Sequence, residues 1–227
     1  MDTISFRLHR DYWDCGNLYN RCAHTFNKGL TVLVGCNGAG KSTTIRQIYD
    51  KLTADDRPVF RFDNVSSGGN SFYSGLLEGY YPGGIRVLSS LVSSSEGEKI
   101  QQNLAIEAKT GLNMALKKAK ESGDKELFLL FDAIDSGASI DNIIEMKDFF
   151  KLIIQDQKER NDINVFVIVS ANSYEMASGE ACYDIAHNKY ITFKDYDDYK
   201  KFILKSRKFK NRRLEKFNNK RKESGGE

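Results

Sequence analysis

The sequence predicts an α/β fold in which a mostly parallel sheet is covered by helices on both faces. Two apolar runs, "ELFLLF" (126–131) and "NVFVIVS" (164–170), have the length and composition of strands buried on both sides. Between them, residues 139–158 carry isoleucine and phenylalanine at helical spacing. A third buried strand, 29–35, leads through a glycine-rich loop into a helix at 41–52. Strands that alternate with helices in this way are typical of parallel sheets.

The other elements follow in chain order. "TISFRLH" (3–9) alternates in the manner of a half-buried strand, and residues 11–28 are expected to form a hairpin or an irregular strand pair. "PVFRF" (58–62) returns to strand. The Gly- and Ser-rich residues 64–84 indicate a loop with short helical pieces. Apolar residues then recur at helical spacing over 95–121, which predicts one long helix.

The length of 227 residues fits one domain with an appendage. We expect an α/β domain at 1–194, closed by a short strand at 189–193, and a C-terminal helix or tail at 195–227. No run of eighteen apolar residues is present, so no membrane span is expected, and the N-terminus lacks the pattern of a signal peptide. The expected location is the cytoplasm, where four cysteines without metal-site spacing would be free thiols.

Charge is distributed unevenly along the chain. Residues 200–222 contain twelve Lys or Arg and one acid, Glu215, whereas residues 1–199 hold 22 basic against 28 acidic residues. An amphipathic helix is predicted over 195–220. A basic helix of this kind suits nucleic acid, an acidic partner or an anionic membrane surface. The alternative is a solvated or disordered C-terminus.

The motif "GCNGAGKST" matches G-x-x-x-x-G-K-[ST] and lies between a buried strand and a helix. Its glycines let backbone N–H groups turn inward around phosphates, and the helix N-terminus adds a favourable dipole. Lys41 is expected to reach the β- and γ-phosphates, and Ser42 to hold Mg²⁺. The motif therefore predicts binding of ATP with Mg²⁺. The residues of this phosphate loop are Gly35, Cys36, Asn37, Gly38, Ala39, Gly40, Lys41, Ser42 and Thr43.

Asp132 follows the buried strand 126–131, at the carboxyl edge of the predicted sheet. Ligands collect at this edge in open α/β folds. An aspartate after an apolar run, taken alone, is an ordinary loop residue, but beside a phosphate loop it is expected to hold Mg²⁺ through water. Ser42 and Asp132 are therefore the expected metal ligands.

The segment "SSSEGEK" (93–99) leads directly into the long predicted helix. With the phosphate loop and the strand-end aspartate around it, the chain resembles the ABC-type P-loop ATPases, and particularly their soluble SMC/RecF-like branch. The resemblance covers about residues 1–193 and implies a compact ABC-ATPase-like head without a coiled-coil arm. Ser95, Gly97 and Glu98 match the family signature, while one leucine and one glycine of that signature are replaced.

In that family the signature of one subunit meets the γ-phosphate bound by the other. The resemblance therefore implies a homodimer joined by an ATP sandwich, or a complex with a partner effector subunit. "DSGAS" (135–139) looks like the family's D-loop, and Asn172 stands where its switch histidine would be. The simpler interpretation of 93–99 is a Ser-rich cap for the following helix, and capping and phosphate binding would use the same exposed amides.

Hydrolysis depends on residues at which the chain departs from the family. Ala133 stands where the family has its general-base glutamate, and a positioned base contributes about 10²–10⁴-fold to rate. Asp135 is a candidate substitute, although a D-loop carboxylate can equally face the dimer partner. Asn172 can orient a phosphate or a water molecule but carries no charge. Together with Lys41 and Asp132, Asp135 and Asn172 form the expected catalytic set.

Two further positions are expected only by analogy with the family. The Q-loop glutamine has no obvious counterpart, and Asp63 or Asn64 is the nearest polar residue. Tyr12 or Trp13 is a candidate to stack on adenine, with a place in the core as the alternative.

Two functions remain open at this point. In the first, the protein is a slow ATPase that couples hydrolysis to work on DNA or on a partner effector, as in DNA maintenance, defence or mobile-element systems. In the second, it is a binding switch or regulatory subunit that dimerises on ATP and seldom hydrolyses it. A transport ATPase is disfavoured because the signature ends in Glu98 rather than glutamine.

Overall fold

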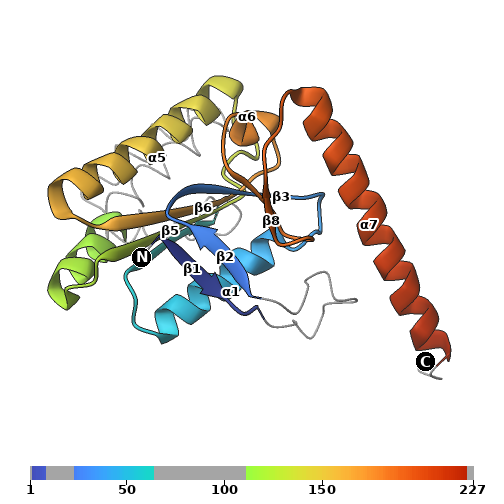
Figure 1. The fold of residues 1–227 in the computed structure, drawn as a ribbon, viewed down its shortest axis with the longest axis horizontal. Helices are drawn as coiled ribbons and strands as arrows, with labels where there is room; N and C mark the ends of the chain where they lie inside the picture. Colours follow the sequence, from blue (N-terminus) through green and yellow to red (C-terminus); the bar gives the residue numbers. More distant parts are fainter. Residues whose placement is uncertain (1, 9–22, 64–110, 224–227) are drawn as a thin grey trace, which may run out of the picture.

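The computed structural model describes residues 2–8, 23–63 and 111–223. It has a central sheet with helices on both faces, and a long C-terminal helix runs along one side (Figure 1). Residues 111–122 are helical as well. The named elements in chain order are β1 (Thr3–Phe6), β2 (His24–Asn27), β3 (Gly29–Val34), α1 (Lys41–Ala54), β4 (Val59–Asp63), β5 (Glu126–Asp132), α5 (Ile140–Asn161), β6 (Asn164–Ser170), α6 (Tyr174–Ala177), β7 (Cys182–Asp184), β8 (Lys189–Ile191) and α7 (Tyr196–Glu223).

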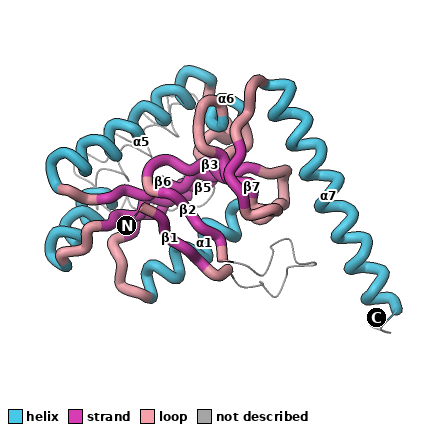
Figure 2. Tube along the Cα trace, viewed as in Figure 1, coloured by secondary structure: helices cyan, strands magenta, loops and turns pink. Residues whose placement is uncertain are grey.

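Within the described residues, the central sheet has six strands in the order β4–β5–β6–β3–β7–β8. Figure 2 shows strands at the centre of the molecule with helices around them. Its neighbouring strands run parallel, except for the antiparallel pair β7–β8. β1 and β2 form a separate antiparallel pair. The predicted α/β fold with a mostly parallel sheet is therefore confirmed. The register pairs Leu33 with Ser170 and Val34 with Asp184, so the ends of β6, β3 and β7 meet at one edge.

The two faces of the sheet bury separate hydrophobic clusters, because side chains alternate along each strand. On β5, Phe128 and Leu130 join the cluster that contains α1 and the β1–β2 pair. Leu127, Leu129 and Phe131 point to the opposite face and pack in the cluster that contains α5 and the helical residues 111–122. Both faces are covered, which explains why β5 and β6 are continuous apolar runs rather than alternating ones.

Several predicted boundaries differ from the observed ones. The first strand ends at Phe6 rather than at residue 9, and the last ends at Ile191 rather than 193. Residues 11–28 were expected to form a hairpin or an irregular strand pair. In the described part of this interval, β2 forms and pairs with β1. The short elements α6 and β7 were not predicted, because three or four residues are too few to show a period.

Some predictions lie outside the described residues. They concern the loop at 64–84, the signature with Ser95, Gly97 and Glu98, and the first part of the helix predicted at 95–121. The Q-loop candidate Asn64 and the adenine candidates Tyr12 and Trp13 also lie there.

The predicted C-terminal helix is present as α7, and its inner side packs on the head. Tyr199 is buried and contacts the rings of Tyr174 and Phe193, while Phe202 contacts Phe193 as well. Ser206 is also buried. The helix is therefore part of the folded domain over these turns, and the division predicted at residue 194 stays a prediction.

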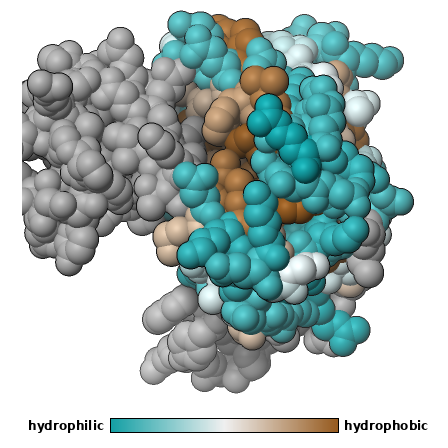
Figure 3. Space-filling model, turned by 90° about the vertical axis from the view of Figure 1, so that its left-hand side faces the viewer, coloured by the Kyte–Doolittle hydropathy of each residue, from teal (hydrophilic) through white to brown (hydrophobic). Residues whose placement is uncertain are grey.

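Long helices on opposite sides of the molecule expose different side chains. Figure 3 shows a band of hydrophobic residues between hydrophilic ones on one side of the molecule. On α5 the exposed large apolar side chains include Ile140, Ile144 and Leu152. On α7, half of the side chains described as exposed are Lys or Arg. No helix in the described part of the chain is long and apolar enough to cross a membrane.

Candidate functional site

The phosphate loop connects the end of β3 to the start of α1, at the carboxyl edge of the sheet. Gly40 precedes the helix with a φ of 98°, a conformation that strains residues with a side chain. At Gly35 a Cβ would lie 2.9 Å from the Cβ of Ala39, so the loop closes on itself only with glycine there. The sequence thus folds locally into the tight turn that the motif predicts.

Lys41 is buried at the first position of α1, with an exposed fraction of 7%. Its Nζ donates to the carbonyl oxygen of Gly35 at 2.9 Å, so the ammonium group lies over the loop. Burial lowers the pKa of Lys41 below its ordinary value, although three nearby acidic groups act in the opposite direction. A buried cation with one neutral acceptor is electrostatically suited to a phosphate, which would supply charge-assisted partners.

Ser42 and Asp132 meet across the edge of the sheet. The Oγ of Ser42 donates to Oδ1 of Asp132 at 3.1 Å, and the Oγ of Ser170 donates to the same oxygen at 2.5 Å. Ser170 in turn accepts from the N–H of Ala133 at 2.8 Å. These hydrogen bonds fix the buried carboxylate of Asp132, which is 4% exposed.

The oxygen ligands of this pair fit Mg²⁺, which prefers carboxylate, hydroxyl and water oxygens. No cluster of three or more His, Cys, Asp or Glu suited to a metal occurs among the residues that the structure describes. A magnesium ion here would therefore be held jointly by Ser42, Asp132, water and the phosphates of a nucleotide. Domains with this loop bind the ion in this shared manner.

Sequence reasoning did not identify Ser170, although it ends the predicted strand "NVFVIVS" (164–170). Its position as the last residue of a buried strand is the available signal, because parallel strands end at one edge. A serine at a strand end is otherwise unremarkable.

Ala133 adopts a φ of 54°, which is uncommon for a residue other than glycine. Its carbonyl accepts from the N–H of Ser136 at 3.1 Å, in the turn that leaves β5. The methyl side chain has no group that accepts a proton. The structure thus places an inert side chain directly after Asp132.

Asp135 and Asn172, the residues predicted for the D-loop and switch positions, lie side by side. One carboxylate oxygen of Asp135, Oδ2, accepts from the N–H groups of Asn172 and Ser173 and from the Oγ of Ser173, each at 2.7 Å. The other oxygen, Oδ1, is buried without a hydrogen-bond partner. Ser173 also caps α6. Asp135 therefore holds the turn that carries Asn172.

The Q-loop candidate Asp63 ends β4 and pairs in register with Asp132 on β5. Its carboxylate accepts from the guanidinium of Arg61 at 2.9 Å. Asp63 lies at the same sheet edge as the phosphate loop. Two strands, β5 and β6, separate its strand β4 from β3, which leads into the loop.

Two residues of α7 contact the phosphate loop directly. The buried N–H of Cys36 donates to the Oγ of Ser206 at 3.1 Å, and the Nζ of Lys210 donates to the carbonyl oxygen of Asn37 at 2.7 Å. These contacts join residues about 170 positions apart, and no local pattern in the sequence predicts them. Beside them lies a cavity of about 240 Å³, lined by Gly35, Cys36, Asn37, Asn172, Tyr199, Ile203, Leu204 and Arg207.

A family model described as an AAA domain matches residues 23–172, which is more than half of the chain. The matched range contains the phosphate loop, Asp132 and Asp135, and it ends at Asn172. No curated protein matches the chain. The match supports the P-loop ATPase head predicted from sequence and does not extend to the narrower SMC/RecF-like branch.

Proposed function

The chain belongs to the AAA domain family, and from that premise we propose that it binds ATP with Mg²⁺ and acts as a nucleotide-dependent switch with slow turnover. The observation that supports this most strongly is the arrangement at the sheet edge. A buried lysine lies over the loop, and a serine–aspartate pair lies at the start of α1. These are the groups that phosphoryl-transfer sites use for positioning and charge stabilisation.

Each residue has a separate task in binding. Lys41 supplies positive charge to the β- and γ-phosphates, and the inward N–H groups of the loop bind phosphate oxygens. Ser42 and Asp132 hold Mg²⁺, which neutralises charge on the phosphates when it is bound. Ser170 positions Asp132 through its 2.5 Å hydrogen bond.

We expect slow turnover because the described part of the site has no clear general base to activate a water molecule for hydrolysis. Ala133 offers no base, and a missing base costs about 10²–10⁴-fold in rate. Asp135 is a weak substitute, because one of its oxygens already accepts three hydrogen bonds from residues 172–173. Its buried Oδ1 is the remaining acceptor. These contacts favour a positioning role for Asp135 and a long-lived ATP-bound state.

The nucleotide site is tested by comparing the wild type with Lys41→Ala and with Lys51→Ala in ATP titrations by calorimetry. Lys41→Ala removes the cation over the loop and should abolish ATP binding. Lys51 is an exposed lysine near the end of the same helix, so its loss should leave affinity unchanged. A folded Lys41→Ala protein with wild-type affinity would exclude the site.

The ATP-bound form is a homodimer, or a complex with an effector subunit, in which Ser95 and Gly97 of one copy meet the γ-phosphate of the other. The resemblance of 93–99 to a family signature supports this. Light scattering with ATP and Mg²⁺ tests it: Ser95→Arg should bind ATP and stay monomeric. A wild type that is monomeric at saturating ATP would count against the homodimer.

The exposed basic side of α7 is the proposed contact for nucleic acid or for an acidic partner effector. Exposed cations follow one another along its outer turns, and α7 also contacts the phosphate loop. Nucleotide binding can therefore alter the element that carries the basic surface. A DNA-linked role, such as DNA maintenance or defence, is the role we propose for such a surface. The cations concerned are Lys200, Lys201, Lys205, Arg207, Lys208, Arg212 and Lys216.

A further inference from the structure

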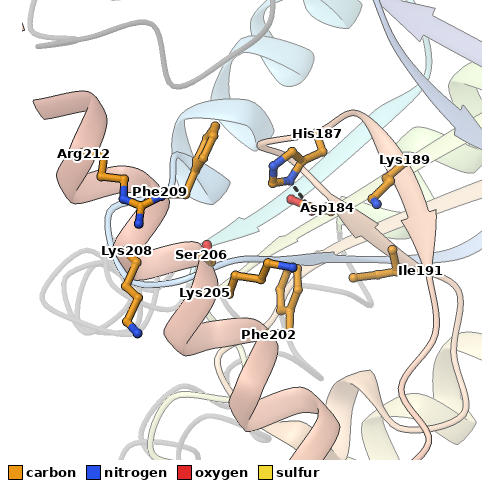
Figure 4. A pocket seen from close by; sticks show the side chains of 10 residues that line it. All are labelled: Asp184, His187, Lys189, Ile191, Phe202, Lys205, Ser206, Lys208, Phe209 and Arg212. Carbon is orange, nitrogen blue, oxygen red and sulfur yellow. Dashed lines mark hydrogen bonds and ion pairs between the residues drawn. The ribbon is translucent and has the colours of Figure 1, made fainter. Parts of the chain in front are cut away.

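A second cavity, of about 410 Å³, opens at the same sheet edge on the other side of α7 (Figure 4). One wall is the β7–β8 hairpin and the other is α7. Because β7 pairs with β3 and Val34 lies opposite Asp184, this hairpin turns directly beside the start of the phosphate loop. Ser206 lines the cavity and also accepts from the N–H of Cys36 in the loop. The cavity and the phosphate loop are therefore neighbours.

Flat and apolar side chains line the inner part of the cavity. The rings of His187 and Phe209 lie with their centroids 4.8 Å apart, one from each wall. Phe202 of α7 and Ile191 of β8 line the same walls (Figure 4). Rings of this kind offer a face on which a planar heterocycle can stack, and such contacts tolerate any base because every base has a π-face.

Asp184 orients the ring of His187. The ring's Nδ1 donates to Oδ2 of Asp184 at 2.6 Å, and Oδ1 of Asp184 accepts from the N–H of Ala186 at 3.0 Å. Asp184 is 3% exposed, so these hydrogen bonds satisfy its carboxylate within the fold. The ring of His187 is thus oriented before any ligand arrives.

Positive charge surrounds the apolar lining. Lys189 comes from β8, and Lys205, Lys208 and Arg212 come from α7. Among the described residues that line the cavity, the one carboxylate is Asp184, which already accepts hydrogen bonds within the hairpin. Such a cavity suits a ligand with a planar ring, hydroxyl or ring-nitrogen acceptors, and nearby negative charge.

We propose that this cavity takes the base and ribose of the nucleotide whose phosphates lie on the phosphate loop. The inference rests on the proposed ATP site. Its volume lies within the range of small-molecule sites, and aromatic lining with a few polar groups is typical of them. The base lies against His187 and Phe209, and the cations of α7 line the outer side. The basic helix is then part of the nucleotide site itself.

The experiment compares two ligands that differ only in the nucleoside: ATP and inorganic tripolyphosphate. Binding of each is measured by calorimetry with the full chain and Mg²⁺. His187→Ala and Phe209→Ala should each weaken ATP binding by about tenfold, the size of a lost base–aromatic stack. Tripolyphosphate affinity should not change, because the phosphate loop is intact. Phe209→Tyr keeps the ring and should restore ATP affinity.

Phe149→Ala is the matched control, since this half-exposed phenylalanine lies on α5, away from the cavity. ATP affinity that is unchanged in His187→Ala and Phe209→Ala would overturn the proposal. An equal loss for ATP and tripolyphosphate would also overturn it, because α7 would then act only by supporting the loop. Lys41→Ala should weaken both ligands. A wild type that binds neither would refute the phosphate site rather than the base site.

Discussion

The two flanks of the phosphate loop are built in opposite ways. On the β5–β6 flank, the carboxylates of Asp132 and Asp135 are 4% and 6% exposed and accept hydrogen bonds from hydroxyl and backbone donors. On the β7–α7 flank, the charges are mostly cations on the solvent side of a helix. A buried charge requires internal partners, whereas a solvated one does not. The carboxylates of the acidic flank are therefore fixed by hydrogen bonds within the fold, whereas most cations of the basic flank face solvent.

This difference agrees with the division of tasks that we propose for the site. Phosphoryl transfer needs groups that are already positioned when the nucleotide arrives, and Asp132, which accepts hydrogen bonds from Ser42 and Ser170, is positioned in this way. Recognition of a nucleotide base or of a macromolecular partner tolerates more movement of the side chains. It gains from exposed charge and from the faces of aromatic rings. The following experiments test this division, from the largest expected effect to the smallest.

Asp132→Asn should have the largest effect, because it removes the charge of the proposed magnesium ligand while keeping an oxygen that accepts from Ser42 and Ser170. We expect ATP affinity in the presence of Mg²⁺ to fall by up to about 100-fold, the scale of losses at metal-positioning residues. Without Mg²⁺ the variant and the wild type should bind ATP alike. Titrations with and without the ion measure this.

Asp124→Asn is its control. This carboxylate lies just before the opposite end of β5, where Arg57 donates to it at 2.7 Å. Its loss should lower stability without changing the magnesium dependence. An Asp132→Asn protein with a wild-type response to Mg²⁺ would contradict the assignment of the acidic flank.

Ala133→Glu adds a carboxylate at the position where the resemblance to the ABC-type ATPases implies a general base. Turnover, measured as steady-state phosphate release, should rise by about 10²-fold if the missing base limits the rate. Ala133 already carries a Cβ at a φ of 54°, so glutamate introduces no new kind of backbone strain. A fast wild type that is unaffected by this change but inactive as Asp135→Ala would make Asp135 the base.

The acidic flank was also the more predictable one. The strands 126–131 and 164–170 are long apolar runs, and the motif at 35–43 fixes its own turn, so local pattern was sufficient. Asp132 followed because parallel strands end at one edge. The partner hydroxyl of Ser170 did not follow, since the register that places it there belongs to the folded sheet.

The basic flank was predictable only as a helix. The composition of 200–222 indicated a basic amphipathic segment, and α7 is present. Its position depends on contacts between residues about 170 apart, such as Cys36 with Ser206, for which a single sequence gives no signal. The hairpin strands β7 and β8 have three residues each, too few for a period. The second cavity could therefore not be predicted.

On the basic flank, Lys200→Glu combined with Lys201→Glu should weaken binding to a DNA oligonucleotide while ATP binding stays unchanged. Neither lysine lines a cavity beside the loop. The log–log salt slope should fall by roughly one unit for each lysine that contacts a phosphate. Fluorescence anisotropy over a salt series measures this. Lys117→Glu with Lys120→Glu, on the helical residues 111–122, is the control. Equal losses in both double variants would indicate a net-charge effect rather than a contact surface.

Ser206→Ala tests a hydrogen bond that attaches α7 to the phosphate loop, and the effects expected here are the smallest of the series. The variant leaves the N–H of Cys36 buried without its acceptor, which costs about 1–3 kcal/mol. Ser206→Thr keeps the hydroxyl and should stay near wild type. Lys210→Met removes a second bond to the loop, but Lys210 is partly exposed and water can replace it, so its effect should be smaller. Thermal unfolding gives the order of the three variants. If Lys210→Met destabilises the protein more than Ser206→Ala, the helix is held by its charges, and the two flanks are more alike than their burial indicates.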